Sequence, residues 1–442
     1  MIKKIYTERG HMYCMTMHVI VSIRVIGCTD VENLEEAIYY AVNRFEGLRC
    51  QVRQDAYGEA YFVHSGQRCN PPIEVRDYHL NAEQFRVEQE RIIFKFNEGE
   101  TIRFVIEDLG DEICLRIVEH HMVGDGKSLM ILVNEILTNL SEIESGCSSY
   151  KDKPMIPLQN LGKEYYEKNL EIGDLLKRSI MEYNELWNRQ KRIFTYEDYK
   201  EFFYTYWSKN RTSVRCLKID KLIVDELKKI SKIHNVSINS TLVTAAAKAF
   251  ESNKKVVVVV DAKPKECKGM GNYAGVLMID NNYDESRSFW ENAQYNHNLV
   301  HAQLVNRSDS MLPYALAGLK DCNFDDATQL ESAGCLEDEI AHSYNELYNP
   351  KGQIGLVISN LGADNVKSQY GRIHVADVEI HSPMNRSMGC SLCISTTNGI
   401  MSIIMEYTEE SADIYETMLD GIEENLIQLV YQYEQVQEHY FV

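Results

Sequence analysis

The chain has 442 residues, of which 44% are hydrophobic and 25% charged, the balance of a globular protein with large cores and not of a disordered chain. Its formal net charge of −20 repels phosphate backbones and anionic lipids, so we expect neither nucleic acid nor a membrane surface as a partner. At about 150 residues per domain, the length indicates two or three domains.

The cysteine pattern indicates a reducing environment. Twelve cysteines are scattered along the chain without a secretory signal, so we expect buried thiols and not a disulfide framework. The close pair Cys390 and Cys393 has no second pair of cysteines or histidines nearby, which argues against a metal site. No apolar run approaches the roughly 18 residues of a membrane span. We therefore expect a cytoplasmic protein, monomeric and without a bound metal.

Residues 1–150 alternate between strand and helix patterns. The predicted strands are residues 17–27, 50–53, 60–64, 102–107 and 112–119, and the predicted helices are residues 31–47, 81–96 and 128–140. This order is typical of a mixed α/β layer structure, not of a helix bundle or a β-sandwich.

Residues 151–211 differ from their surroundings because they are helical in pattern, charged and rich in aromatic residues. We interpret them as a helical connector packed on both halves. From residue 212 to residue 442 the α/β pattern resumes. The predicted strands are residues 213–219, 255–261, 274–280, 355–359, 374–381, 391–396 and 401–406, and the predicted helices are residues 221–234, 239–251, 288–306 and 411–433. The repeated pattern indicates two structurally related halves.

The strongest chemical signal is the string HHMVGDG, residues 120–126, at the end of a predicted strand. Adjacent strand residues face opposite sides, so only one of His120 and His121 can turn toward a cleft. Asp125 can cap the following helix or hold a basic side chain, while Gly124 and Gly126 allow backbone torsions closed to other residues. The alternative is an ordinary strand–turn–helix with a capping aspartate and core histidines.

In this setting the HHxxxDG string resembles the signature of the chloramphenicol acetyltransferase-like acyltransferases. That superfamily includes nonribosomal peptide condensation domains, plant BAHD acyltransferases and free-standing O-acyltransferases. The resemblance covers nearly the whole chain and extends to four shorter segments: NRFEGLRCQV from Asn43, GETIRFVIED from Gly99, GNY from Gly271 and ISNLG from Ile358. It implies an α/β fold of two acetyltransferase-like subdomains, residues 1–150 and 212–442, in a V-shaped pseudo-dimer with a tunnel between them.

The resemblance also implies an activity and roles for individual residues. The protein would move an acyl group from a pantetheine thioester to a small-molecule hydroxyl or amine, with acyl-coenzyme A or an acyl carrier protein acting in trans and no permanently bound cofactor. His121 matches the catalytic general base, and a histidine suits this role because its free pKa lies near ~6.5. Asp125 and Gly126 complete the motif. The partner implied for Asp125 is a basic residue of the second half, here Lys263.

The remaining site residues have supporting roles in this interpretation. His120 and Gly124 would shape the loop, and Ser359 or Asn360 would donate to the developing oxyanion. The segments typical of peptide-forming condensation domains are not recognisable, so we favour a free-standing acyltransferase. A stand-alone condensation enzyme and an inactive binding protein on the same fold remain the alternatives.

Other candidate sites carry less weight. His297 and His301 are spaced as metal ligands on a helix, but no third ligand completes a motif, so we expect a solvated face. Ser240 opens a predicted helix and is expected to cap it, because no G-x-S-x-G string occurs in the sequence.

Overall fold

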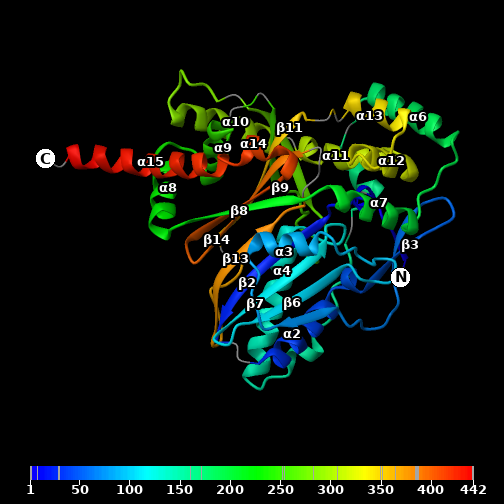
Figure 1. Cartoon of the computed structure of the whole chain (residues 1–442), viewed down its shortest axis with the longest axis horizontal. Helices are drawn as coiled ribbons and strands as arrows, with labels where there is room; N and C mark the ends of the chain where they lie inside the picture. Colours follow the sequence, from blue (N-terminus) through cyan, green and yellow to red (C-terminus); the bar gives the residue numbers. More distant parts are fainter. Residues whose placement is uncertain are drawn as a thin grey trace.

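The computed structural model describes residues 2–440 except 7, 28, 29, 160, 171, 251, 253, 282, 306, 349, 351, 364 and 384–387. Within these residues, two six-stranded mixed sheets form two lobes, and a three-stranded sheet lies beside them (Figure 1). The predicted mixed α/β architecture of two halves is therefore confirmed. Each lobe has its own hydrophobic core. None of the described helices is both long and apolar enough to cross a membrane.

The first sheet has the strand order β12-β13-β2-β7-β6-β5. Its strands are β2 (His18–Ile26), β5 (Ile73–Arg76), β6 (Ile102–Asp108), β7 (Glu112–His120), β12 (Gln369–Tyr370) and β13 (Ile373–His381). Helices α2 (Val31–Arg44) and α4 (Gly126–Glu144) belong to this lobe and pack against each other. Leu34, Ile38 and Val42 are fully buried on α2, as its helical spacing predicts.

The second sheet has the strand order β10-β9-β11-β14-β15-β8. Its strands are β8 (Thr212–Ile219), β9 (Lys255–Asp261), β10 (Ala274–Asp280), β11 (Ile354–Ala363), β14 (Met388–Thr397) and β15 (Ile400–Thr408). Helices α8 (Lys221–Ile233), α9 (Ile238–Ala249), α10 (Phe289–Val305), α14 (Ala412–Tyr415) and α15 (Met418–Tyr440) belong to this lobe. Strand β9 pairs on both sides, with β10 and β11, so its Val-rich run is central as predicted.

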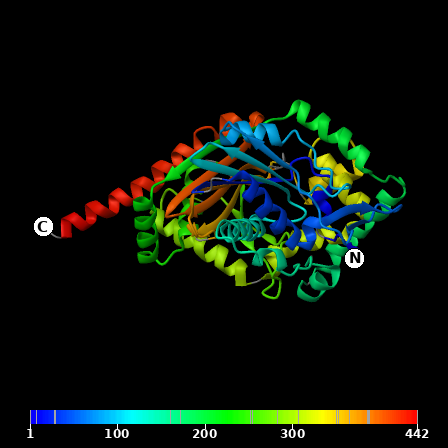
Figure 2. The same ribbon diagram turned by 90° about the horizontal axis from the view of Figure 1, so that it is seen from below.

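The first sheet contains strands from both halves of the chain. Strands β12 and β13 lie in the second half of the chain, yet β13 pairs antiparallel with β2 of the first sheet from His374 and Ile26 to His381 and Ile20. In Figure 2 these orange and blue strands lie side by side. The expected division into residues 1–150 and 212–442 is therefore crossed by a strand exchange.

The connector packs on both lobes. It contains α5 (Lys163–Asn169), α6 (Asp174–Asn188) and α7 (Tyr196–Lys209). On α7, Trp207 Nε1 donates to the Met15 carbonyl of the first half, at 3.1 Å. On α6, Asn184 Nδ2 donates to the Leu319 carbonyl of the second half, at 2.9 Å.

Several elements differ from the sequence interpretation. The helix expected at residues 81–96 is α3 (Ala82–Gln89), which ends early because the chain turns at residues 90–92 and then runs irregularly, burying both Phe94 and Phe96. The strands predicted at residues 50–53 and 60–64 are β3 (Cys50–Gln54) and β4 (Ala60–His64), which form the short sheet together with β1 (Ile2–Lys4). Strand β1 was not predicted from the sequence, nor were the helices α1 (Arg9–Met12), α11 (Arg307–Leu319), α12 (Cys322–Ser332) and α13 (Glu339–Tyr348). A buried ion pair from Arg9 to Asp326 joins α1 to α12.

Candidate active site

His121 follows the last residue of β7, where the chain leaves the first sheet. Its N–H donates to the Met17 carbonyl at 2.9 Å, which continues the pairing beyond β2. Its ring nitrogen Nδ1 lies 2.8 Å from the Gly124 carbonyl oxygen. A carbonyl can only accept, so Nδ1 carries the proton, and in the neutral ring Nε2 carries a free lone pair. This is the tautomer that a general base needs.

The surroundings keep the imidazole of His121 neutral. Burial lowers its pKa below the usual 6.5, although the hydrogen bond to Gly124 and the nearby Asp125 oppose this effect. The ring stacks on that of His11 from α1, with centroids 5.2 Å apart and planes inclined by 17°. The stacking and the Nδ1–H bond together fix the direction of the ring.

Asp125 holds two parts of the chain together. One carboxylate oxygen accepts from the N–H of Ser128 at 2.8 Å and caps α4, and the other accepts from the N–H of Tyr273 in the second half at 2.8 Å. The expected ion pair to Lys263 is wrong. Lys263 Nζ donates instead to the Gly269 carbonyl at 2.8 Å, because the main-chain N–H of Tyr273 already occupies the oxygen that faces the second half.

The first turn of α4 joins three of the segments singled out in the sequence. Ser128 Oγ donates to the Gly271 carbonyl at 2.6 Å. Lys127 Nζ donates to the Leu361 carbonyl and to Asn365 Oδ1, both at 2.8 Å. The HHxxxDG, GNY and ISNLG segments therefore meet at one helix end, which fixes the position of His121 relative to the second half.

Both glycines of the motif lie close to neighbouring side chains. A Cβ atom on Gly124 would lie 2.6 Å from a carboxyl oxygen of Glu119, and one on Gly126 would lie 3.0 Å from Leu361 and 3.1 Å from Ile380. Glu119 is fully buried and its oxygens have no partner among the described residues. Burial, and secondarily Asp125, raise the pKa of Glu119 well above 4.5, which favours its protonated form.

His120, the first histidine of the motif, lies among aromatic side chains. It points away from His121 and packs edge-on against Phe94 and Phe96. Its Nδ1 accepts from the N–H of Met122 at 3.2 Å. Burial, with smaller contributions from His121 and Arg103, lowers the pKa of His120 to about 3, so it stays neutral.

A cavity of about 500 Å³ lies between the halves, in front of His121. Its walls are mostly aliphatic, with Met17 and Val19 from the first half and Val257, Val259, Val276 and Val357 from the second sheet. Ser359 and Asn360 border it at the end of β11. Asn360 Nδ2 donates to Asn239 Oδ1 at 3.2 Å, which leaves its second amide N–H available to a ligand.

Solved structures share this architecture along almost the entire chain. The polyketide synthase associated protein 5 from Mycobacterium tuberculosis is 14% identical with a TM-score of 0.60, and 98% of each chain is covered. The condensation domain from the monacolin K polyketide synthase MokA is 13% identical, again over 98% of each chain, with a TM-score of 0.62. The trichothecene 15-O-acetyltransferase from Fusarium sporotrichioides is 10% identical over 96% of this chain and 94% of that one, with a TM-score of 0.63.

The chain has the condensation-domain fold. No protein-family model matches it. A segment of 170 residues, 37% of the chain, is 26% identical to malpinin synthetase of Mortierella alpina and spans 2% of that protein's length. The solved structures confirm the condensation fold that the sequence resemblance implied.

Two histidines at the site of this condensation fold were missed by the sequence analysis. His11 stacks on His121, and His381 borders the same cavity from β13. Neither lies in a motif, and each reaches the site through contacts between residues distant in sequence. No pattern in the sequence singles them out.

Ser240 and His297, considered separately in the sequence, are hydrogen-bonded. Ser240 Oγ lies 3.0 Å from His297 Nδ1, but Ser240 also lies 2.8 Å from the hydroxyl of Ser237. Ser237 is the residue that caps α9, so the expected capping role of Ser240 is wrong. Ser240 is 2% exposed, which makes it a poor nucleophile for a substrate in solution.

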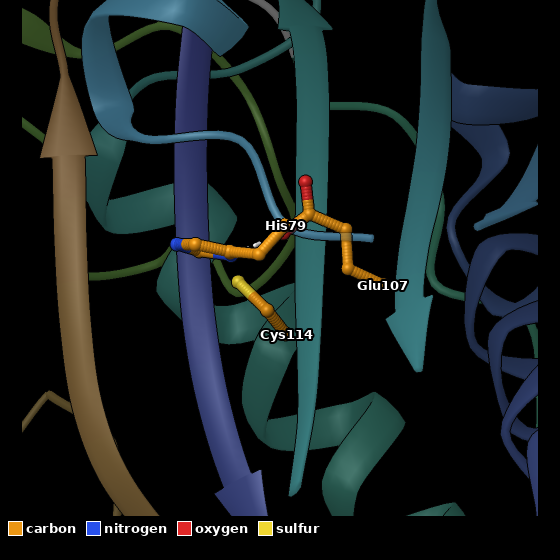
Figure 3. A group of neighbouring side chains, drawn as sticks. All are labelled: His79, Glu107 and Cys114. Atoms are coloured by element: carbon orange, nitrogen blue, oxygen red, sulfur yellow. Dashed lines mark hydrogen bonds and ion pairs between the residues drawn. The ribbon is translucent and has the colours of Figure 1, made fainter. Parts of the chain in front are cut away.

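A possible metal-binding group consists of Glu107 on β6, Cys114 on β7 and His79, which follows β5 (Figure 3). Its carboxylate already has a cationic partner, because Arg116 approaches both Glu107 oxygens at 3.0 Å. Burial raises the pKa of Cys114 to about 12, so the thiol is protonated. We interpret the group as an ion-pair network, with His79 Nδ1 2.7 Å from Glu107.

Proposed function

We propose that the protein is an acyltransferase that moves an acyl group from a pantetheine thioester to a hydroxyl or amine. The observation that carries this proposal is the orientation of His121. Its Nδ1–H is bonded to the Gly124 carbonyl, and the ring borders an apolar cavity between the two halves. The condensation-domain fold of the chain supports the same reaction class.

In the proposed reaction, His121 Nε2 takes the proton of the acceptor as its oxygen or nitrogen attacks the thioester carbon. The new C–O or C–N bond forms, and the carbonyl oxygen becomes an oxyanion. The hydroxyl of Ser359 or the free amide N–H of Asn360 would stabilise that charge. The oxyanion then collapses, the C–S bond breaks, and the protonated imidazole returns its proton to the leaving thiolate. Asp125, Lys127 and Gly126 act by holding the loop in place.

The proposed donor is acyl-coenzyme A. A net charge of −20 disfavours approach of acidic carrier proteins, whereas a few basic residues at a tunnel mouth suffice for coenzyme A. The alternative is a stand-alone condensation enzyme that takes carrier-bound substrates in trans. Parallel assays with the same acyl group on both donors distinguish the two. A preference of more than about tenfold for the carrier, with a rate that falls as salt rises, would favour the alternative.

The experiment that tests the proposal is release of free thiol from acetyl-coenzyme A in the presence of a panel of alcohols and amines. We expect acceptor-dependent thiol release and a matching acylated product by mass spectrometry. The His121→Ala variant should lose both. Wild-type protein that binds ligands but releases no thiol from either donor would instead identify an inactive binding protein on this fold.

A further inference from the structure

The cavity is bordered by a further histidine, His381, that the proposed reaction does not use. His381 is the last residue of β13 and is 1% exposed, yet its side chain borders the same cavity as His121. The lining of that cavity is mostly aliphatic, and it also includes the hydroxyl residues Ser359 and Ser382.

A buried carboxylate orients this ring. His381 Nδ1 lies 2.7 Å from Glu406 Oε1 on β15, and both side chains are 1% exposed. Arg86 of α3 lies on the other side, with Nε 3.6 Å from the same oxygen, and its Nη1 donates to the His18 carbonyl at 3.0 Å. Glu406 is therefore fixed between a guanidinium of the first half and the imidazole. Because a carboxylate can only accept, Nδ1 of His381 carries the proton.

The other ring nitrogen of His381, Nε2, is available to a ligand. Among the described residues, Nε2 of His381 has no hydrogen-bond partner, and it is not one of the enclosed polar atoms of the structure. In the neutral ring this nitrogen is an acceptor. A fixed acceptor in a mostly aliphatic cavity favours ligands that bring a hydrogen-bond donor to it. A ligand without such a donor binds more weakly, because it leaves the buried acceptor unpaired.

We propose that His381, oriented by Glu406, is a specificity-determining residue that accepts a hydrogen bond from a hydroxyl or N–H of the substrate, at a point separate from the atom that His121 deprotonates. The inference rests on the proposed function in that the cavity is the substrate site. It assigns to that site a bifunctional, largely apolar substrate, such as a diol, an amino alcohol or a hydroxyacyl donor.

The test measures binding without any thioester, so that it does not depend on turnover. The probes are α,ω-alkanediols of increasing chain length and their monomethyl ethers, which keep both oxygens but lack one donor. The measured quantity is the ratio of diol to ether affinity by calorimetry. Comparing that ratio between wild type and variants cancels differences in ligand hydration.

The variants separate the two ring nitrogens. His381→Asn keeps a donor near Nδ1 for Glu406 and removes Nε2, so we expect the best diol-to-ether ratio to fall about threefold to tenfold. His381→Gln places a polar atom near the former Nε2 position and should restore part of the diol-to-ether ratio. His374→Asn, at an exposed position of the same strand, is the matched control and should leave the ratio unchanged.

Nitrogen-15 spectra of histidine-labelled wild-type protein provide a readout that does not depend on a variant folding. The diol should shift the Nε2 resonance of His381 more than the ether does. Equal ratios in wild type and His381→Asn, or an unchanged Nε2 resonance, would overturn the proposal. Repeating the acyl-transfer assay with hydroxyacyl and plain acyl donors then shows whether the acceptor or the donor carries the hydroxyl or N–H that binds His381. Loss of turnover with the diol preference intact would contradict the proposed function alone.

Discussion

The two histidines His121 and His381, which both border the cavity, are held in different ways. His121 is oriented by the main chain three residues away, through the Gly124 carbonyl. His381 is oriented by the side chain of Glu406, 25 positions away on another strand. A main-chain contact within a tight loop needs glycines at fixed spacing, so it is visible as a motif, whereas a carboxylate partner needs only the tertiary fold. The histidine in the motif, His121, is assigned to chemistry, and His381 is assigned to substrate selection.

The largest effect should come from removing the proposed base, His121. We expect His121→Ala to remain folded and to lose about 10²-fold or more of its acyl-transfer rate, measured as thiol release. His120→Ala is the matched comparison. It should lower the melting temperature more than the rate, because His120 packs on Phe94 and Phe96 away from the cavity. If His120→Ala abolished transfer at unchanged stability, the roles of the two histidines would be reversed.

The next effect concerns Asp125, which joins the motif loop to the second half of the chain. Asp125→Asn places an amide where one carboxylate oxygen now accepts from Tyr273 N–H, or where the other caps α4. One donor is left unpaired, which should cost about 1–3 kcal/mol of unfolding free energy. Activity and stability should fall together in denaturant titrations and rate assays. A fall in rate at unchanged stability would point to direct participation of Asp125 in proton transfer.

A smaller effect is expected for the carboxyl beneath the motif loop. Because the folded-state pKa of Glu119 is raised, its contribution to stability is complete below pH 4.5 and is lost as the pH rises toward the folded-state value. Glu119→Gln removes this dependence, so between pH 4.5 and pH 8 the variant should gain about 1 kcal/mol or more relative to wild type. Glu201→Gln, at an exposed position of α7, is the control. Parallel stability curves for wild type and Glu119→Gln would show that Glu119 is ionised in the fold.

The smallest effect is in the pH dependence of the rate. Since burial lowers the pKa of His121 below 6.5, the neutral base already predominates above that pH. The acyl-transfer rate should therefore rise with pH below 6.5 and change by less than about twofold from pH 6.5 to pH 8. A rate that keeps rising tenfold over that interval would contradict a depressed pKa.

The sequence predicts the parts of the fold that have their own periodicity. The Val-rich β9 and the amphipathic α2 were found at their correct places because their side chains face a core in a regular pattern. Residues 307–348 gave no such pattern, although they form α11, α12 and α13. The site divides in the same way. His121 and Asp125 lie in a local motif, while His381 and its partner Glu406 come together only through strand pairing. The Lys263 partnership failed because a main-chain N–H occupies the expected position, and main-chain donors leave no trace in the sequence.

The strand exchange has a consequence for how the protein is made. Residues 20–26 of β2 pair with residues 374–381, so the first sheet cannot be completed until the ribosome has synthesised most of the chain. Until then one edge of a nine-residue strand is open to pairing with other chains. Contacts over such separations also slow folding, because a long loop must close before they form. A fragment ending at the connector would therefore expose an unpaired edge, and co-expression with the missing second half should be needed to keep it from aggregating.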